Sequence, residues 1–137
     1  MRGEIEGGAD DRRFAQFAAR LGGRRILGAE VDTVGATLNF PAHLARLGAT
    51  RIDYVGVGPF RPTTSKAKLA PVHSPSSLAA LIAAAAPRPA FAIGGVAAAD
   101  FPSLRALGAY GIAVSGAIAL AADPEAAARA LVAAVGD

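Results

Sequence analysis

The chain has 137 residues, the size of one domain, with 53% hydrophobic and only 6% aromatic residues. It contains no cysteine, which excludes a disulfide framework and a thiolate metal site. The net charge of +3 is small with scattered arginines, and no apolar run reaches membrane-spanning length, so neither nucleic acid nor membrane is an expected partner. We therefore expect a single soluble domain over residues 1–137, located in the cytoplasm.

The first half of the chain contains two predicted helices and two predicted strands. Apolar residues recur at helical spacing over about residues 10–21, where a pair of glycines ends the pattern. An extended run follows over residues 31–39, and the short helix PAHLARL then begins at a proline and ends before Gly48. The next extended run covers residues 52–57. A degraded fifth strand is expected in MRGEIEGG, at the start of the chain.

The second half continues the alternation of helix and strand, and each element is bounded by a capping residue, a proline or a glycine. The elements are a helix capped by Ser74 and stopped before Pro87, a strand from Ala90 to Ile93, a helix FPSLRAL capped by Asp100 and stopped by Gly108, a strand from Gly111 to Val114, and a helix from Asp123 to about Val135. Strand, loop and helix thus repeat along the chain.

This repeat predicts an α/β fold with parallel strands. The strands are near-continuous apolar runs, as expected where both faces of a sheet are covered, and repeated βα units imply right-handed crossovers. Two architectures fit the repeat, a part of a (β/α)8 barrel and a small doubly wound sheet. Gly56 and Gly58 are a weak dinucleotide signal, because they lie inside and at the end of a strand with no third glycine after them.

Small residues end the last two predicted strands. Gly94 and Gly95 follow one strand, and Ser115, Gly116 and Ala117 follow the next. Loops of this kind bind phosphate through backbone N–H groups in barrels, because glycine lets the anion approach closely. Tight turns require glycine as well, so the glycines alone leave both interpretations open. Their occurrence after two consecutive strands favours a phosphate site.

Hydroxyl residues and a lysine follow the preceding strand, in the stretch DYVGVGPFRPTTSK. Thr63, Thr64, Ser65 and Lys66 are expected at the same carboxyl edge of the sheet. They would add hydroxyl donors and one cation to a bound anion, and Arg61 is the other cation in this stretch. Such a loop alone is usually a solvated turn, but its combination with the glycines predicts a site.

The only histidines are His43 and His73. Neither has a second histidine or a carboxylate at metal-ligand spacing, so they do not predict a metal site. His43 lies in the short helix PAHLARL and is expected to be a surface residue.

Four segments, in this order and spacing, resemble the thiamine-phosphate synthase family: VGATLN, GPFRPTTSK after DYVGV, AIGGV, and GIAVSGAI. The resemblance runs from about Val34 to the C-terminus. It implies the C-terminal half of a (β/α)8 barrel, with about four to five parallel strands. It also implies a transferase of thiamine biosynthesis that joins 4-amino-2-methyl-5-hydroxymethylpyrimidine diphosphate to thiazole phosphate and releases pyrophosphate, with magnesium as cofactor.

The resemblance implies a nearly complete site for thiazole phosphate. Thr63 and Ser65 would hold this substrate. Gly95, Ser115 and Gly116 would bind its phosphate through backbone N–H and hydroxyl groups.

The pyrimidine diphosphate half of the implied site is less complete. Thr37 and Lys66 would contact the diphosphate, and Lys66 would be the catalytic cation because it can neutralise the departing charge. The family's other diphosphate-binding residues and its magnesium ligands belong to the N-terminal half of the barrel, which this sequence does not match. Asp10 and Asp11 lie near the position of one magnesium ligand but match it poorly, so the metal ligands are unknown.

Three functions therefore stay open at this point: a thiamine-phosphate synthase, a thiazole tautomerase-like enzyme, and a non-catalytic phosphate-binding remnant. The tautomerase relies on a histidine to which His43 corresponds loosely. A half barrel has open sheet edges and an uncovered apolar face. We therefore expect either a homodimer that completes the barrel or aggregation.

Overall fold

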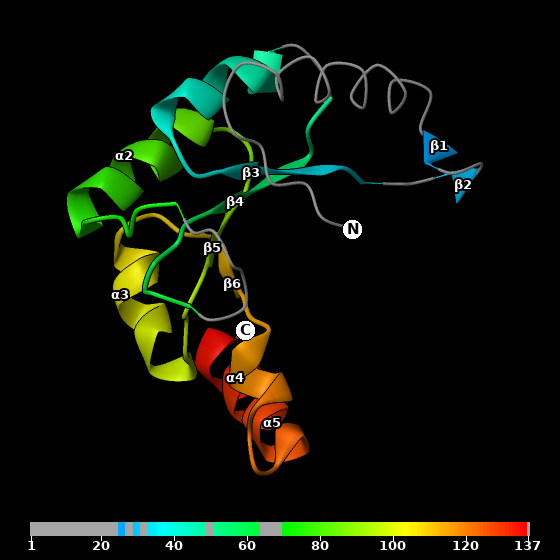
Figure 1. Cartoon of the computed structure of the whole chain (residues 1–137), viewed down its shortest axis with the longest axis vertical. Coiled ribbons are helices and arrows are strands. Elements are labelled where there is room, and N and C mark those ends of the chain that lie inside the picture. Colours follow the sequence, from blue (N-terminus) through cyan, green and yellow to red (C-terminus); the bar gives the residue numbers. More distant parts are fainter. Residues whose placement is uncertain (1–24, 27–28, 31–32, 49–50, 64–69, 137) are drawn as a thin grey trace.

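Four short parallel strands form the centre of the structure (Figure 1). The computed structural model describes residues 25–26, 29–30, 33–48, 51–63 and 70–136. The strands are β3 (Gly35–Leu38), β4 (Tyr54–Val57), β5 (Ala90–Ile93) and β6 (Gly111–Ala113), in the spatial order β3-β4-β5-β6. Parallel pairing between all neighbours confirms the predicted α/β fold.

The strand order favours a barrel over a doubly wound sheet. Each strand from β4 to β6 lies beside the strand that precedes it in the chain, so the sheet grows in one direction. A doubly wound sheet reverses direction at a switch point, whereas a (β/α)8 barrel adds its strands in sequence order. Within the described strands, the order is that of consecutive barrel strands.

The helices begin and end at the residues that their sequence favours. Ser74 caps α2 (Pro75–Ala85) by accepting a hydrogen bond from the Ser77 N–H at 3.1 Å. Asp123 caps α5 (Pro124–Val135) in the same way, through the Ala126 N–H at 2.9 Å. The remaining elements are η1 (Pro41–Gly48), η2 (Ala98–Asp100), α3 (Phe101–Ala106), α4 (Gly116–Ala119), β1 (Arg25–Ile26) and β2 (Ala29–Glu30). No helix in the described ranges is long and apolar enough to cross a membrane.

The hydrophobic core lies between one face of the sheet and the helices. Leu38, Val57, Ala92 and Ile112 occupy equivalent positions across the four strands and therefore point to the same side. This side packs against α2, η1 and α3, and Figure 1 shows α2 and α3 along one side of the strands. The fully buried large side chains are Leu38, Leu78, Leu104, Val55 and Val57.

The opposite face of the sheet is open among the described residues. Tyr54 and Ile93 on this face are 41% and 38% exposed. The Phe91 ring lies between those of Tyr54 and Tyr110, with centroids 5.8 and 5.5 Å away. The expectation that both faces of the sheet are covered is therefore not met by this part of the chain. A closed barrel would turn this face inward.

His43 is buried, and the prediction that it is a surface residue is wrong. Only 7% of the residue is exposed. Its Nδ1 accepts the Asn39 N–H at 3.3 Å, and its ring contacts the edge of Phe40 at 5.2 Å. The short helix η1 turns this position toward the end of β3, which the sequence of the helix alone did not indicate.

Two predicted elements, the helix over residues 10–21 and the fifth strand in MRGEIEGG, lie outside the described residues. Conversely, the sequence did not predict the antiparallel pair of two-residue strands β1 and β2.

The expected homodimer stays a prediction, and the open face of the sheet provides its physical reason. Exposed Tyr54, Ile93 and Tyr110 form an apolar patch that favours association. Light scattering of the purified chain is expected to give a dimer or a larger assembly. Tyr110→Lys should shift the population toward monomer, because it places a charge beside Phe91, whereas Val132→Lys on α5 should not. A monodisperse monomer of the unsubstituted chain would contradict the prediction.

Candidate functional site

The candidate site lies at the carboxyl edge of the sheet, where ligands of parallel α/β sheets bind. Thr37 lies near the end of β3, and residues 58–63, called the β4 loop below, follow β4. Residues 94–95, called the β5 turn, follow β5, and residues 115–116 follow β6. Because all four strands run in the same direction, their carboxyl ends bring these segments to one edge.

Backbone hydrogen bonds join the β4 loop to the β5 turn. The Phe60 N–H donates to the carbonyl oxygens of Ile93 at 3.0 Å and Gly94 at 3.1 Å. The Arg61 N–H donates to the Gly94 carbonyl at 2.9 Å. The hydrogen-bonded residues are 33 or 34 positions apart in sequence, yet the two segments pack directly against each other. Their relative position is therefore fixed by main-chain contacts.

The glycines of the β5 turn permit this close packing. Gly94 and Gly95 have φ of +90° and +66°, a region that other residues rarely adopt. A Cβ atom on Gly94 would lie 2.8 Å from the Pro59 Cα, and one on Gly95 would lie 2.7 Å from the Arg61 Cβ. The glycines thus have a packing role of their own. The predicted binding of phosphate by Gly95 stays a prediction.

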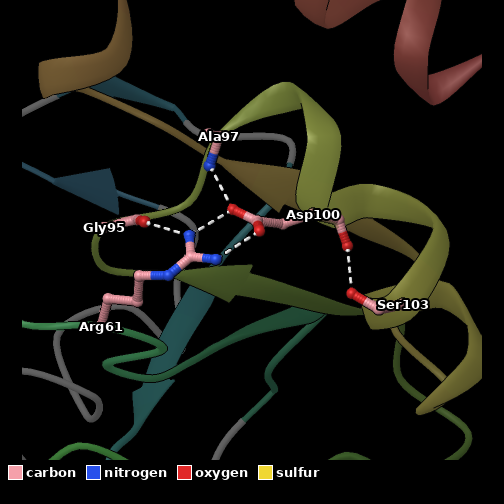
Figure 2. A network of polar contacts seen from close by, with 5 residues as sticks. All are labelled: Arg61, Gly95, Ala97, Asp100 and Ser103. Atoms are coloured by element: carbon pink, nitrogen blue, oxygen red, sulfur yellow. Dashed lines mark hydrogen bonds and ion pairs between the residues drawn. The ribbon is translucent and has the colours of Figure 1, made fainter.

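Arg61 forms a bidentate ion pair with Asp100 (Figure 2). Its Nη1 and Nη2 atoms donate to Asp100 Oδ2 and Oδ1, each at 2.5 Å. Nη1 also donates to the Gly95 carbonyl at 3.2 Å. The charge of Arg61 is therefore compensated by a carboxylate, which the sequence analysis did not anticipate for this cation.

Asp100 occupies the predicted N-cap position of α3, but its side chain has another role. Its side chain does not cap α3. Instead Oδ2 accepts the Ala97 N–H at 2.8 Å, and the backbone carbonyl accepts the Ser103 hydroxyl at 2.8 Å. The hydrogen bonds from Arg61, and to a smaller extent that from Ala97, hold the pKa of Asp100 below its ordinary value. The predicted N-cap position is correct, but the carboxylate faces Arg61 and the preceding turn and forms no capping hydrogen bond with α3.

His73 holds the other end of the β4 loop, a role that the sequence analysis missed. Its Nε2 lies 3.1 Å from the Gly58 carbonyl and its Nδ1 lies 2.9 Å from the Ser77 hydroxyl. Because a carbonyl only accepts, this geometry places a proton on Nε2. The His73 N–H also donates to the Pro59 carbonyl at 3.1 Å. His73 thus links the loop to the first turn of α2.

The structure describes five of the seven predicted site residues. Thr37 is exposed on the open face of the sheet, and Thr63 is half-buried at the end of the β4 loop. Ser115 is exposed at the start of α4, and its hydroxyl does not cap that helix. The residues that the structure brings to the carboxyl edge are Thr37, Thr63, Gly95, Ser115 and Gly116. Ser65 and Lys66 lie outside the described residues.

A comparison with family models matches residues 8–118 to thiamine monophosphate synthase. The chain belongs to the thiamine monophosphate synthase family. The thiamine-phosphate synthase of Salinispora arenicola is 44% identical over 128 residues, which cover 91% of this chain and 56% of that protein.

Two solved structures are similar to this family member. A thiamine phosphate pyrophosphorylase from Pyrococcus furiosus gives a TM-score of 0.62 with 27% identity, over 74% of this chain and 47% of that one. A 3-hexulose-6-phosphate synthase gives a TM-score of 0.61 with 28% identity, over 93% and 58% of the two chains. The matches confirm the predicted partial barrel. The chain spans about half the length of these relatives.

The described carboxylates do not fit the magnesium site that the family implies. No group of three or more His, Asp or Glu residues in the described part of the chain could hold a metal ion. Asp100 is engaged by Arg61 and Ala97, and Asp53 is engaged by Arg51 and the Val34 N–H. Asp10 and Asp11 lie outside the described residues.

Gly94→Ala is expected to lower the free energy of unfolding by about 1–3 kcal/mol, because alanine is strained at this positive φ and its Cβ would strike the Pro59 backbone. Urea denaturation, monitored by circular dichroism, measures the change in the free energy of unfolding. Gly48→Ala is the matched control, since a Cβ there meets nothing within 4 Å. Equal stability of the two variants would contradict the packing role of Gly94.

Asp100 should make the stability of the chain sensitive to acid. Because its folded-state pKa lies below the ordinary value of 3.8, its contribution is present above pH 3.8 and is lost as the pH falls through the lowered pKa. The difference in urea midpoint between the unsubstituted chain and Asp100→Asn should therefore be largest near about pH 6 and should shrink toward about pH 3. Glu125→Gln, in an exposed ion pair, is the control. A difference that does not vary with pH would contradict this assignment.

Proposed function

We propose that this chain takes part in thiamine-phosphate synthesis and holds thiazole phosphate at the carboxyl edge of its sheet. The reaction joins 4-amino-2-methyl-5-hydroxymethylpyrimidine diphosphate to thiazole phosphate. The bond between the pyrimidine methylene carbon and the diphosphate oxygen breaks, and pyrophosphate leaves with the electron pair. The thiazole nitrogen then forms the new bond to that carbon. Membership of the thiamine monophosphate synthase family supports the proposal.

The observation that carries the proposal is the junction of the β4 loop with the β5 turn. Its backbone hydrogen bonds and two positive-φ glycines hold main chain from two neighbouring strands together at the carboxyl edge. Backbone N–H groups and hydroxyls in such a loop cluster are suited to a phosphate, because they are fixed before the anion arrives. Thr63 is the last residue of the β4 loop, two positions after Arg61.

The end of β6 would complete the binding of the phosphate. Gly116 begins α4, and the Ser115 hydroxyl is not used to cap it. In the proposal this hydroxyl and the backbone around Gly116 donate to the phosphate, while Gly95 contributes from the neighbouring turn. Ser65 would contact the thiazole phosphate from the segment that follows Thr63.

Two residues are assigned to the pyrimidine diphosphate. Thr37, exposed on the open face, would contact this substrate, and Lys66 would stabilise the departing diphosphate as its negative charge develops. The described carboxylates do not fit a magnesium site, and the proposal assigns no residue to the metal. The complete reaction by this chain alone is part of the proposal, since the chain spans about half of its relatives.

Isothermal titration of the purified chain with thiazole phosphate tests the binding half of the proposal. Ser115→Ala is expected to weaken the affinity by about 10- to 100-fold, the usual cost of a hydrogen bond to a charged group. Thr33→Ala is the control, because it removes an exposed hydroxyl before β3, at the opposite edge of the sheet. Failure of the unsubstituted chain to bind thiazole phosphate would overturn the proposal.

The synthase half is tested by adding pyrimidine diphosphate and magnesium and measuring thiamine phosphate. Turnover should fall by about 100-fold or more in Lys66→Ala, since it removes a charge that acts on the transition state. Undiminished turnover in this variant would exclude the role of Lys66. Binding of thiazole phosphate without any turnover would limit the chain to phosphate binding.

A further inference from the structure

The ion pair between Arg61 and Asp100 joins two segments that belong to different loops of the candidate site (Figure 2). The two residues are 39 positions apart in sequence. Arg61 lies in the β4 loop, and Asp100 ends η2, which follows the β5 turn. The pair therefore spans the two segments from which Thr63 and Gly95 come.

The contacts of the pair fix both segments at once. The guanidinium group donates to both carboxylate oxygens and to the Gly95 carbonyl. The same carboxylate accepts the Ala97 N–H, which fixes the short stretch between the β5 turn and η2. The planar fork of an arginine matches the two oxygens of a carboxylate and allows little rotation. Each partner thus orients the backbone of its own segment relative to the other.

The pair is poorly suited to act as a countercharge for phosphate. The side chain of Asp100 is only 12% exposed, whereas that of Arg61 is 49% exposed. An anion approaching the guanidinium would also approach the carboxylate, whose charge opposes it. Because the guanidinium is already engaged by a carboxylate and a carbonyl, the property that this pair supplies to a ligand is the geometry of its two segments.

We propose that Arg61 and Asp100 are positioning residues that hold the β4 loop against the β5 turn, so that Thr63 and Gly95 face one phosphate group together. The inference rests on the proposed binding of thiazole phosphate at this edge. It adds two residues that do not touch the substrate but set the spacing of those that do. The rival explanation is that Arg61 itself binds the phosphate.

A double-substitution cycle distinguishes the two explanations. Arg61→Met, Asp100→Asn and the double variant are titrated with thiazole phosphate. If the pair positions the loops, each single change weakens the affinity by about 10-fold, and the double change is no worse than either single one. Arg61→Lys is expected to bind thiazole phosphate as weakly as Arg61→Met, because an ammonium group cannot match both carboxylate oxygens.

The outcome is opposite if Arg61 binds the phosphate directly. Asp100→Asn then leaves the affinity unchanged or raises it, because a cation is released from its partner, while Arg61→Met lowers it. This result would overturn the positioning role. Arg129→Met is the matched control, since Arg129 forms an exposed ion pair with Glu125 on α5. It should bind as the unsubstituted chain does.

Hydrogen exchange tests the pair without any ligand. The Phe60 and Arg61 amides donate to carbonyls of Ile93 and Gly94, so they report directly on the junction. Their exchange, followed by NMR, should be about 10-fold faster in Arg61→Lys and in Asp100→Asn than in the unsubstituted chain or in Arg129→Met. Unchanged exchange in both variants would overturn the positioning role, even where thiazole phosphate binds. If the unsubstituted chain binds no thiazole phosphate, the proposed function fails, while exchange still decides the role of the pair.

Discussion

Backbone hydrogen bonds between the β4 loop and the end of β5 are the contacts on which the candidate site depends. The Phe60 and Arg61 N–H groups both donate to main-chain carbonyls at the end of the neighbouring strand. Such contacts require the two backbones to approach without intervening side chains. The positive-φ glycines at 94 and 95 meet that requirement, because any Cβ there would overlap the β4 loop. The rest of the site is arranged around this junction.

Side-chain contacts hold the loop on either side of the junction. His73, which precedes α2 and also contacts Ser77 in its first turn, reaches the Gly58 carbonyl, and Arg61 reaches Asp100 beyond the β5 turn. The loop is therefore fixed at its beginning by one polar contact and in its middle by another. A binding loop that is held in this way loses little conformational freedom when a ligand arrives, so less of the binding energy is needed for ordering.

The architecture explains why a site can exist on so small a sheet. Four parallel strands in sequence order place their carboxyl ends side by side, so four loops meet at one edge. The apolar core beneath them, between the sheet and α2, η1 and α3, fixes the strands. The opposite face, with Tyr54 and Ile93 exposed, is the face that a complete barrel would enclose. The loops of the candidate site and the open face are thus two separate features of the same four-stranded sheet.

The sequence by itself determined the alternation of strands and helices, because each boundary has a local cause. Ser74 and Asp123 cap their helices, and proline follows each of them directly. The family resemblance carried by GPFRPTTSK, AIGGV and VSGAI was confirmed as well. The roles of Ser65 and Lys66 stay predictions, since they lie outside the described residues.

Only the tertiary structure decided which side chains meet. The pairing of Arg61 with Asp100 and the link from His73 to Gly58 depend on contacts between segments that sequence spacing does not relate. The burial of His43 was likewise visible only in the folded chain. Asp100 lies at the N-cap position of α3, as its sequence indicates, but its carboxylate pairs with a guanidinium from the β4 loop and makes no capping hydrogen bond with that helix. Local signals specify elements because capping and hydrophobic periodicity act within a few residues. Partners across the fold are selected by packing, which no local pattern contains.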